Sequence, residues 1–262
     1  MQDIFCNLKL TSVAASLCSA LGVDKPNQAN EPLEALVKLC EGKSVDRVLM
    51  YNPDAIALWI FEKYTDLFTP VMLNTNITLP LESVMPSVTP VCFGTMYTGA
   101  SPEIHGIQAY VKPVIKTDSV FDALIRAGKK PCIVSTGNDS MSKIYLEREM
   151  DYFIVETPDE ANEKAIELIK EDKYDFIAVY NGNYDGTMHR YGPESEESIN
   201  ALKHNIKAFE TLADAVRENW QNHKTLIGFA PDHGCHEIDG GCGSHGLYMP
   251  EDMNIVHFYG II

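Results

Sequence analysis

The sequence of 262 residues has few cations and no long uninterrupted apolar segment. It carries 21 Lys and Arg against 37 Asp and Glu, a formal net charge of -16, so its overall field repels nucleic acids and anionic lipids. No run reaches the roughly 18 to 20 apolar residues that a membrane-spanning helix requires. These absences disfavour a nucleic-acid duplex or a membrane as partner. They do not exclude a phosphate substrate, because bound metal ions can reverse the local charge.

Cysteine is also sparse and irregularly placed. The seven cysteines are an odd number without repeated spacing, and four of them lie in apolar stretches where reduced thiols commonly pack: Cys18, Cys40, Cys92 and Cys132. The beginning of the chain carries Asp3 and only a late cation, Lys9, which is unlike a signal peptide. We therefore expect a soluble, cytoplasmic protein. Its oligomeric state cannot be inferred from these features.

Strand-like and helix-like segments alternate along the chain. Strands are predicted at residues 47–51, 131–135, 152–156, 176–180, 225–230 and 254–259, where β-branched and aromatic residues gather. Helices are predicted at residues 119–127, 159–169 and 197–220. This order predicts an α/β fold, a three-layer α/β/α sandwich with a mostly parallel central sheet. We expect one domain over residues 1–262, with an N-terminal helical segment at about residues 1–45.

Polar loops follow the predicted strands, where open α/β sheets bind their ligands. The four loops with chemically useful side chains are residues 52–54, 181–189, 231–234 and 244–246. Asp185 and His189 stand four residues apart, so one helical turn can direct both side chains at one ion. Taken separately, such a pair also fits a capping aspartate and a surface histidine.

Further candidate ligands lie in the last two loops. Asp232 and His233 are adjacent and precede Gly234, which permits a sharp turn of the backbone around a metal. His245 is flanked by glycine and serine. Each histidine alone has an alternative role as a hydrogen-bonded structural residue. Their recurrence at strand ends favours a metal centre.

Thr89 is the candidate nucleophile. It precedes Pro90, a residue suited to the first turn of a helix, so Thr89 is predicted at a helix N-terminus that favours anions. On local sequence alone, the simpler interpretation is a threonine that only caps its helix.

Together these segments resemble the alkaline phosphatase superfamily, and most closely its nucleotide pyrophosphatase/phosphodiesterase branch. That branch has a nucleophilic Thr followed by a helix and then Thr-Gly-x-x-Pro-x-x-His-Gly-Ile, reproduced here at residues 98–107. It continues with Asp-x-x-x-His-x-x-Gly-Pro, Asp-His-Gly and His-Gly. These correspond to residues 185–193, 232–234 and 245–246, so the resemblance covers roughly residues 46 to 259.

The resemblance implies two divalent metal ions. Zinc suits the ligands best, and manganese or iron would fit the same set. One ion would be held by Asp185, His189 and His245. The other would be held by four residues: Asp54, Asp232, His233 and Thr89.

Two positions depart from the family pattern. At the first, the family usually has Asp-Gly where this chain has Asp54 and Ala55. The alternative role for Asp54 is to cap a helix over residues 55–61. At the second, an Asn of the family binds a phosphoryl oxygen shortly after His-Gly-Ile, but this chain has no Asn there. Tyr110 or Lys112 are the candidates to replace it.

The implied activity is metal-dependent hydrolysis of a small phosphoester or nucleotide through a phospho-threonine at Thr89. A phosphomutase of the same superfamily is the alternative, although such enzymes carry a large cap for which little sequence remains here. A noncatalytic metal-binding member is another. A sulfatase is excluded by the lack of a Cys/Ser-x-Pro-x-Arg motif, since Cys92 has neither the Pro nor the Arg.

Overall fold

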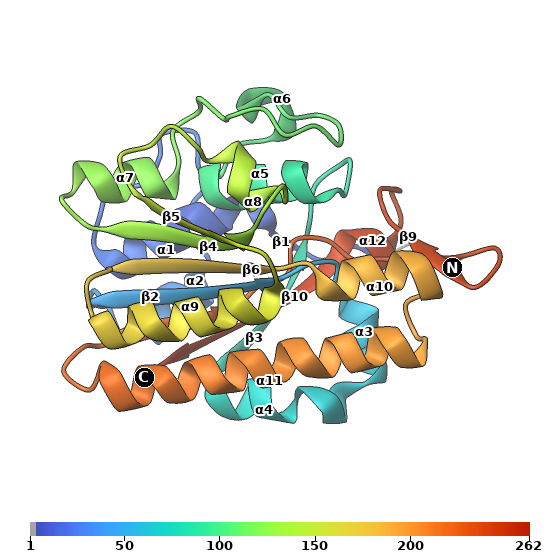
Figure 1. The fold of residues 1–262 in the computed structure, drawn as a ribbon. Helices are drawn as coiled ribbons and strands as arrows, with labels where there is room; N and C mark the ends of the chain where they lie inside the picture. Colours follow the sequence, from blue (N-terminus) through green and yellow to red (C-terminus); the bar gives the residue numbers. More distant parts are fainter. Residues whose placement is uncertain (1–3) are drawn as a thin grey trace.

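The computed structural model describes residues 4–262, so residues 1–3 of the predicted N-terminal segment lie outside the described residues. Its centre is a sheet of eight strands in the order β1-β3-β10-β7-β2-β6-β4-β5 (Figure 1). In chain order these strands are β1 (Leu8–Lys9), β2 (Arg47–Pro53), β3 (Ile77–Glu82), β4 (Pro131–Thr136), β5 (Asp151–Val155), β6 (Phe176–Asn181), β7 (Thr225–Phe229) and β10 (Asn254–Ile261). β10 is antiparallel to both neighbours, and the remaining pairs are parallel.

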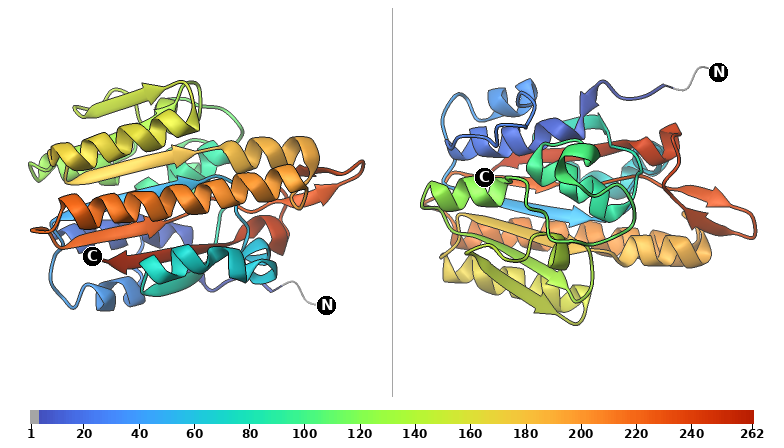
Figure 2. Two further views of the ribbon diagram at one scale, coloured as in Figure 1. Left: turned by 60° about the horizontal axis from the view of Figure 1, so that its bottom comes forward. Right: turned by 90° about the horizontal axis from the view of Figure 1, so that it is seen from above.

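Helices cover both faces of the sheet, which confirms the predicted three-layer α/β/α sandwich (Figure 2). One face carries α1 (Val13–Leu21), α2 (Glu34–Leu39), α5 (Thr89–Thr98), α6 (Pro102–His105), α7 (Val120–Arg126) and α8 (Met141–Ile144). The other carries α3 (Leu58–Lys63), α4 (Thr69–Asn74), α9 (Pro158–Glu171) and α11 (Glu196–Asn219). β2 serves both layers, because Val48 and Met50 pack in one core while Leu49 and Tyr51 pack in the other.

The predicted strands and helices are confirmed to within two residues or less at most ends. The starts of α7 and α9 are fixed by capping boxes, in which Ser119 and Thr157 exchange hydrogen bonds with the residue three positions later. The sequence patterns did not reveal β3, since Pro80 argues against a strand. β3 tolerates this proline because β1 pairs with it only at Leu81 and Glu82, and no other strand within residues 4–262 covers its outer edge.

The carboxyl ends of β7, β2 and β6 lie side by side at one edge of the sheet. α10 (Asn183–Tyr191) follows β6 there. Because β10 is antiparallel, it starts at this same edge, and the segment before it stays there too. That segment comprises the hairpin of β8 (His236–Ile238) and β9 (Cys242–Ser244) and the short α12 (Pro250–Met253), seen beside α10 in Figure 1.

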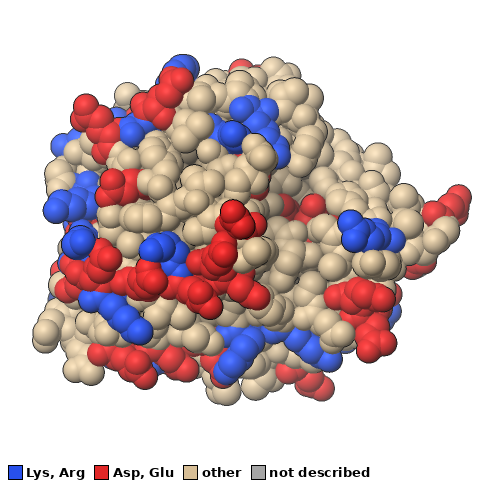
Figure 3. Space-filling model, viewed as in Figure 1, with Lys and Arg blue, Asp and Glu red and all other residues tan. Residues whose placement is uncertain are grey.

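The surface reflects the acidic composition. Figure 3 shows Asp and Glu gathered in a band over α9, with Lys and Arg scattered around it. All seven cysteines are free thiols. Within residues 4–262, no helix combines the length and the apolar character needed to cross a membrane.

Candidate active site

Three predicted ligands meet in a fully buried cluster at the carboxyl ends of β2 and β7. Asp54 follows β2 directly, and Asp232 and His233 belong to the loop after β7. His233 Nε2 lies 3.3 Å from Asp54 Oδ1 and 3.5 Å from Asp232 Oδ2. The exposed fractions are 1% for Asp54 and 0% for Asp232 and His233. We call these three residues the buried cluster.

Two carboxylates buried side by side are costly to keep ionised. Burial, followed by the charge of Asp185, raises the pKa of Asp54 to about 7. Burial and the charge of Asp54 likewise raise the pKa of Asp232 well above its usual range. Burial also lowers the pKa of His233 to about 3, so its imidazole is neutral. The buried cluster therefore carries unbalanced acidic groups.

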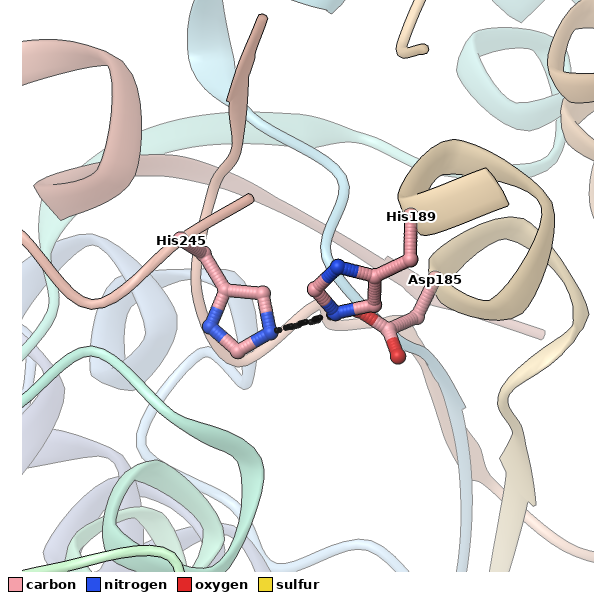
Figure 4. Close-up of side chains that lie close together, drawn as sticks. All are labelled: Asp185, His189 and His245. Carbon is pink, nitrogen blue, oxygen red and sulfur yellow. Dashed lines mark hydrogen bonds and ion pairs between the residues drawn. The ribbon is translucent and has the colours of Figure 1, made fainter. Parts of the chain in front are cut away.

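The other three predicted ligands form an open cluster beside it. Asp185 and His189 project from one turn of α10, and His245 reaches them from the segment just after β9 (Figure 4). Asp185 Oδ1 lies 3.3 Å from His189 Nε2 and 3.4 Å from His245 Nε2. The two Nε2 atoms are 3.0 Å apart. The His189 side chain is 43% exposed, so this cluster faces solvent.

The electrostatics of the open cluster are the reverse of those of the buried cluster. Burial alone would raise the pKa of Asp185, but its contacts with His189 and His245 lower it below the usual range. The same contact with Asp185 raises the pKa of His189 to about 9. Carboxylate and imidazole favour each other's charged form here, whereas the buried cluster has no such pairing.

The two clusters adjoin through stacked imidazoles. The rings of His233 and His245 have centroids 4.1 Å apart and an interplanar angle of 27°. The Nδ1 atom of each site histidine lies within hydrogen-bond distance of a backbone carbonyl. These carbonyls belong to Gly243 for His189 (3.0 Å), Gly234 for His233 (2.9 Å) and Ser87 for His245 (2.8 Å). Every Nε2 is thereby directed into the site, the arrangement that metal-binding histidines usually have.

The residues present fit divalent cations. In each cluster, one ligand atom per residue can be chosen such that all three lie within 4.8 Å of one another. Three carboxylate oxygens are buried without a hydrogen-bond partner in the described part of the chain: Asp54 Oδ1, Asp185 Oδ1 and Asp232 Oδ2. Buried acceptors are normally satisfied, so these oxygens have the character of cation ligands. Mixed imidazole and carboxylate ligands suit zinc, manganese or iron.

Thr89 lies at the start of α5, beside the buried cluster. Its Oγ1 is 3.3 Å from Asp54 Oδ2 and 3.3 Å from His233 Nε2. The N-cap of α5 is Val88, and Thr89 makes no capping hydrogen bond. The alternative reading of Thr89 as a simple helix cap is therefore wrong in this structure, because its hydroxyl points into the site.

Asp54 does not cap a helix either. α3 begins only at Leu58, with Ala57 as its N-cap. Between them, Ala55 has φ 64°, a left-handed conformation that costs little for glycine alone. The Asp-Gly of the resembled family thus matches the backbone found here, although this chain has alanine at that position.

The Thr-Gly motif at residues 98–107 shapes the wall next to α5. His105 is buried and its Nε2 lies 3.0 Å from Thr95 Oγ1. The ring packs so closely on α5 that a Cβ at Gly94 would come within 2.9 Å of it. This motif therefore supports the helix that presents Thr89, and His105 makes no contact with either cluster.

Tyr110 and Lys112 occupy the loop beyond this motif. Tyr110 is 61% exposed. Its pKa is raised, first by the partial burial of its side chain and then by the negative charges of Asp54 and Asp185. Lys112 donates from Nζ to the carbonyl oxygen of Asn138 at 2.7 Å. Tyr110 is thus within electrostatic reach of both clusters, whereas Lys112 is engaged in fastening two loops together.

Sequence reasoning missed one residue of the site, Tyr180. Its hydroxyl donates to Asp54 Oδ2, the same oxygen that Thr89 contacts. A Cβ at Gly182 would lie 2.7 Å from the Tyr180 hydroxyl, so the glycine leaves room for it. A tyrosine at the end of a buried strand resembles any core aromatic, and no local pattern distinguishes it.

Comparison with known proteins gives matches to the resembled family. A family model described as type I phosphodiesterase / nucleotide pyrophosphatase matches residues 131–253. Venom phosphodiesterases 2 and 1 of Crotalus adamanteus are each 35% identical over 97 residues, which are 37% of this chain. The matched parts are only 12% and 11% of those proteins. Five of the six cluster residues fall in the matched range, whereas Asp54 and Thr89 lie before it.

Solved structures share the fold. Human ectonucleotide pyrophosphatase / phosphodiesterase 5 superposes with a TM-score of 0.61 at 16% identity, over 74% of this chain and 58% of that chain. An inactive variant of the murine protein in complex with AMP superposes with a TM-score of 0.58 at 16% identity, over 74% and 59%. This chain therefore spans less than two thirds of the proteins that it resembles.

Proposed function

We propose that this chain hydrolyses phosphoric diesters or pyrophosphate-linked nucleotides through a phospho-threonine at Thr89, in keeping with its similarity to the nucleotide pyrophosphatase/phosphodiesterase branch of the alkaline phosphatase superfamily. Two divalent cations would be bound, and zinc is the metal that the ligands suit best. The open cluster would hold one, and the buried cluster together with Thr89 would hold the other. The observation that carries the proposal is the position of the Thr89 hydroxyl, 3.3 Å from Asp54 and from His233.

The chain's own groups account for much of the chemistry. When bound, the cations lower the pKa of the threonine hydroxyl and offset the negative charge of the phosphate. Thr89 Oγ1 attacks phosphorus as the bond to the leaving oxygen breaks, with Asp54 Oδ2 as the nearest carboxylate acceptor for the hydroxyl proton. Water then cleaves the Oγ1–P bond. The backbone N–H groups at the start of α5 favour the anion throughout.

Hydrolysis is favoured over phosphoryl transfer within a substrate. A mutase needs a cap that keeps water from the phospho-enzyme. Between Thr89 and Asp185, the chain forms three strands of the central sheet and the helices that cover them. The longest stretch between these elements that contains no helix or strand runs from residue 106 to residue 119. That stretch is too short for a cap domain.

A diester or pyrophosphate is favoured over a monoester. A monoester dianion has one more negative charge, and enzymes specialised for it commonly bind the extra oxygens with an arginine. Among residues 4–262, no arginine contacts Thr89 or either cluster, and Lys112 is bonded to Asn138. AMP in the complex of the murine relative supports a nucleotide product.

The test is metal analysis combined with a substrate panel. The purified protein should contain close to two divalent ions per chain, and exhaustive chelation should abolish turnover until zinc or manganese is restored. Paired nitrophenyl diesters and monoesters with the same leaving group should show higher kcat/KM for the diester.

Each opposite outcome rejects a different part of the proposal. Unchanged turnover after chelation rejects metal dependence. A strong monoester preference rejects the substrate class alone. Faster transfer to a sugar hydroxyl than to water favours the mutase, and metal binding without turnover of any phosphoester favours a noncatalytic member.

A further inference from the structure

A buried carboxylate outside both clusters fastens the loop that carries His245. Asp252, on α12, is 0% exposed. Its Oδ2 accepts a hydrogen bond from the backbone N–H of Leu247 at 2.8 Å. Its Oδ1 lies 2.7 Å from Nδ1 of His236, the first residue of β8. Leu247 is two residues beyond His245, so the contact restrains the chain directly after the ligand.

The backbone of Asp252 makes a separate contact on the other side. Its carbonyl oxygen accepts a hydrogen bond from Gly234 N–H at 2.8 Å, next to His233. A Cβ at Gly234 would come within 2.0 Å of the Glu251 carbonyl oxygen, so this close approach requires glycine. The buried cluster is thus held by the Asp252 backbone, and the His245 loop is held by the Asp252 side chain.

The side-chain contact adds to two others that hold this loop: His245 Nδ1 lies 2.8 Å from the Ser87 carbonyl oxygen, and the Tyr248 ring stacks on Phe5 with centroids 4.6 Å apart. Leu247 and Tyr248 are 55% and 62% exposed, and residues 245–249 contain no helix or strand. A fully buried carboxylate is also expensive unless every oxygen is bonded. Such a group is a poor way to add stability, but it fixes one backbone N–H and one imidazole in a defined geometry.

We propose that the Asp252 carboxylate is a positioning residue that keeps His245 in place to bind the metal of the open cluster. The inference rests on the proposed function, since it assumes that this cluster binds a metal. The Asp252 side chain contacts neither the clusters nor Thr89. Its effect should therefore fall on the open cluster and spare the buried cluster in the same molecule.

The experiment is titration of the metal-stripped protein with zinc alone against a competing chromophoric chelator. Wild type should show two binding steps, and His189→Ala identifies the step that belongs to the open cluster. Asp252→Ala should weaken that step by about tenfold or more, the usual effect of losing a partner that orients a ligand. The other step should stay within about threefold of wild type.

Two further variants distinguish positioning from charge and from general damage. Asp252→Asn should keep most of the zinc affinity, because an amide can accept from Leu247 N–H and donate to His236. Asp122→Ala is the matched control, since Asp122 caps α7 and pairs with Arg148. It should lower thermal stability and leave both zinc steps unchanged. If Asp252→Ala does not fold, Asp252→Ser supplies the same comparison.

The inference is overturned if Asp252→Ala leaves the open-cluster step unchanged, as Asp122→Ala should, or if it weakens both steps equally. It is also overturned if Asp252→Asn is as weak as Asp252→Ala, because charge rather than geometry would then be responsible. A wild-type protein that binds no zinc or other divalent ion would instead reject the proposed function, and this inference with it.

Discussion

The two clusters consist of the same residue types, aspartate and histidine, but they differ in how the protein affects the pKa of the carboxylates. In the buried cluster, Asp54 and Asp232 lack charged partners that balance them, and burial raises the pKa of both. In the open cluster, Asp185 contacts two imidazoles that lower its pKa. Burial therefore disfavours ionised carboxylates in the first cluster, whereas contact with imidazoles favours an ionised carboxylate in the second. Proximity of ligands alone thus does not give the two clusters the same electrostatics.

The largest expected effect concerns the nucleophile beside the buried cluster. Thr89→Ala should lower kcat/KM by at least about a thousandfold and leave the fold intact, as expected on removal of a covalent nucleophile. Thr89→Ser should keep partial activity. Thr98→Ala is the control, because Thr98 lies on the same helix but roughly 13 Å further along its axis. Steady-state rates and melting temperatures of the three variants give the answer.

A different result would reject Thr89 as the nucleophile. If Thr89→Ala kept most of its turnover, its hydroxyl would not be the group that attacks phosphorus.

The next effect compares metal retention by the clusters. A chelator should remove one ion quickly and the other slowly, because the His189 side chain is 43% exposed whereas that of His233 is 0% exposed. His189→Ala should abolish the fast phase and keep the slow one, and His233→Ala should do the reverse. Release followed by absorbance of a chromophoric chelator measures both. Loss of both ions in one phase from wild type would contradict the difference between the clusters.

The pH dependence of the metal-free protein should differ between the clusters. Burial raises the folded-state pKa of Asp54 to about 7 from an ordinary 3.8. Between these values the folded protein binds more protons than the unfolded chain, so the contribution of Asp54 to stability falls as pH rises. The lowered pKa of Asp185 has the opposite sign, and its contribution is present above its ordinary pKa.

Denaturant unfolding of the metal-free protein between pH 4 and pH 7 tests this difference. Asp54→Asn should flatten the decline in stability, whereas Asp214→Asn, a change in an exposed ion pair, should not. Equal slopes for wild type and Asp54→Asn would mean that Asp54 is not the group that takes up the proton.

The smallest effect concerns the turn that holds Asp54. Ala55 has φ 64°, so Ala55→Gly should relieve about 1 kcal/mol of strain and be neutral or slightly stabilising. Ala57→Gly is the matched control, because Ala57 is also buried but has φ -71°, and it should destabilise by about 0.5 to 1 kcal/mol. Chemical denaturation gives both values. Equal losses in the two variants would show that Ala55 is not strained.

Local sequence patterns determined the order of the strands and helices and the loops that carry the site. Hydrophobic periodicity and capping residues act over a few positions, so β2, β6, β7, α7, α9 and α11 could be predicted near their observed bounds. The polar residues at strand ends followed from the same reasoning. The motif order added the resemblance to a family and the division of the ligands into two sets. Localisation and the metal identity remain predictions.

Only the tertiary structure decided which side chains meet when they are far apart in the sequence. Thr89 meets Asp54 across 35 positions and His233 across 144, and either contact depends on how α5 packs beside β2 and β7. The strand role of Pro80, the hydroxyl of Tyr180 on Asp54 and the buried carboxylate of Asp252 have the same origin. Each is set by packing between distant segments, whereas a sequence pattern records only neighbours along the chain. The contrast between the buried and the open cluster is therefore a property of burial, which the identical ligand types do not encode.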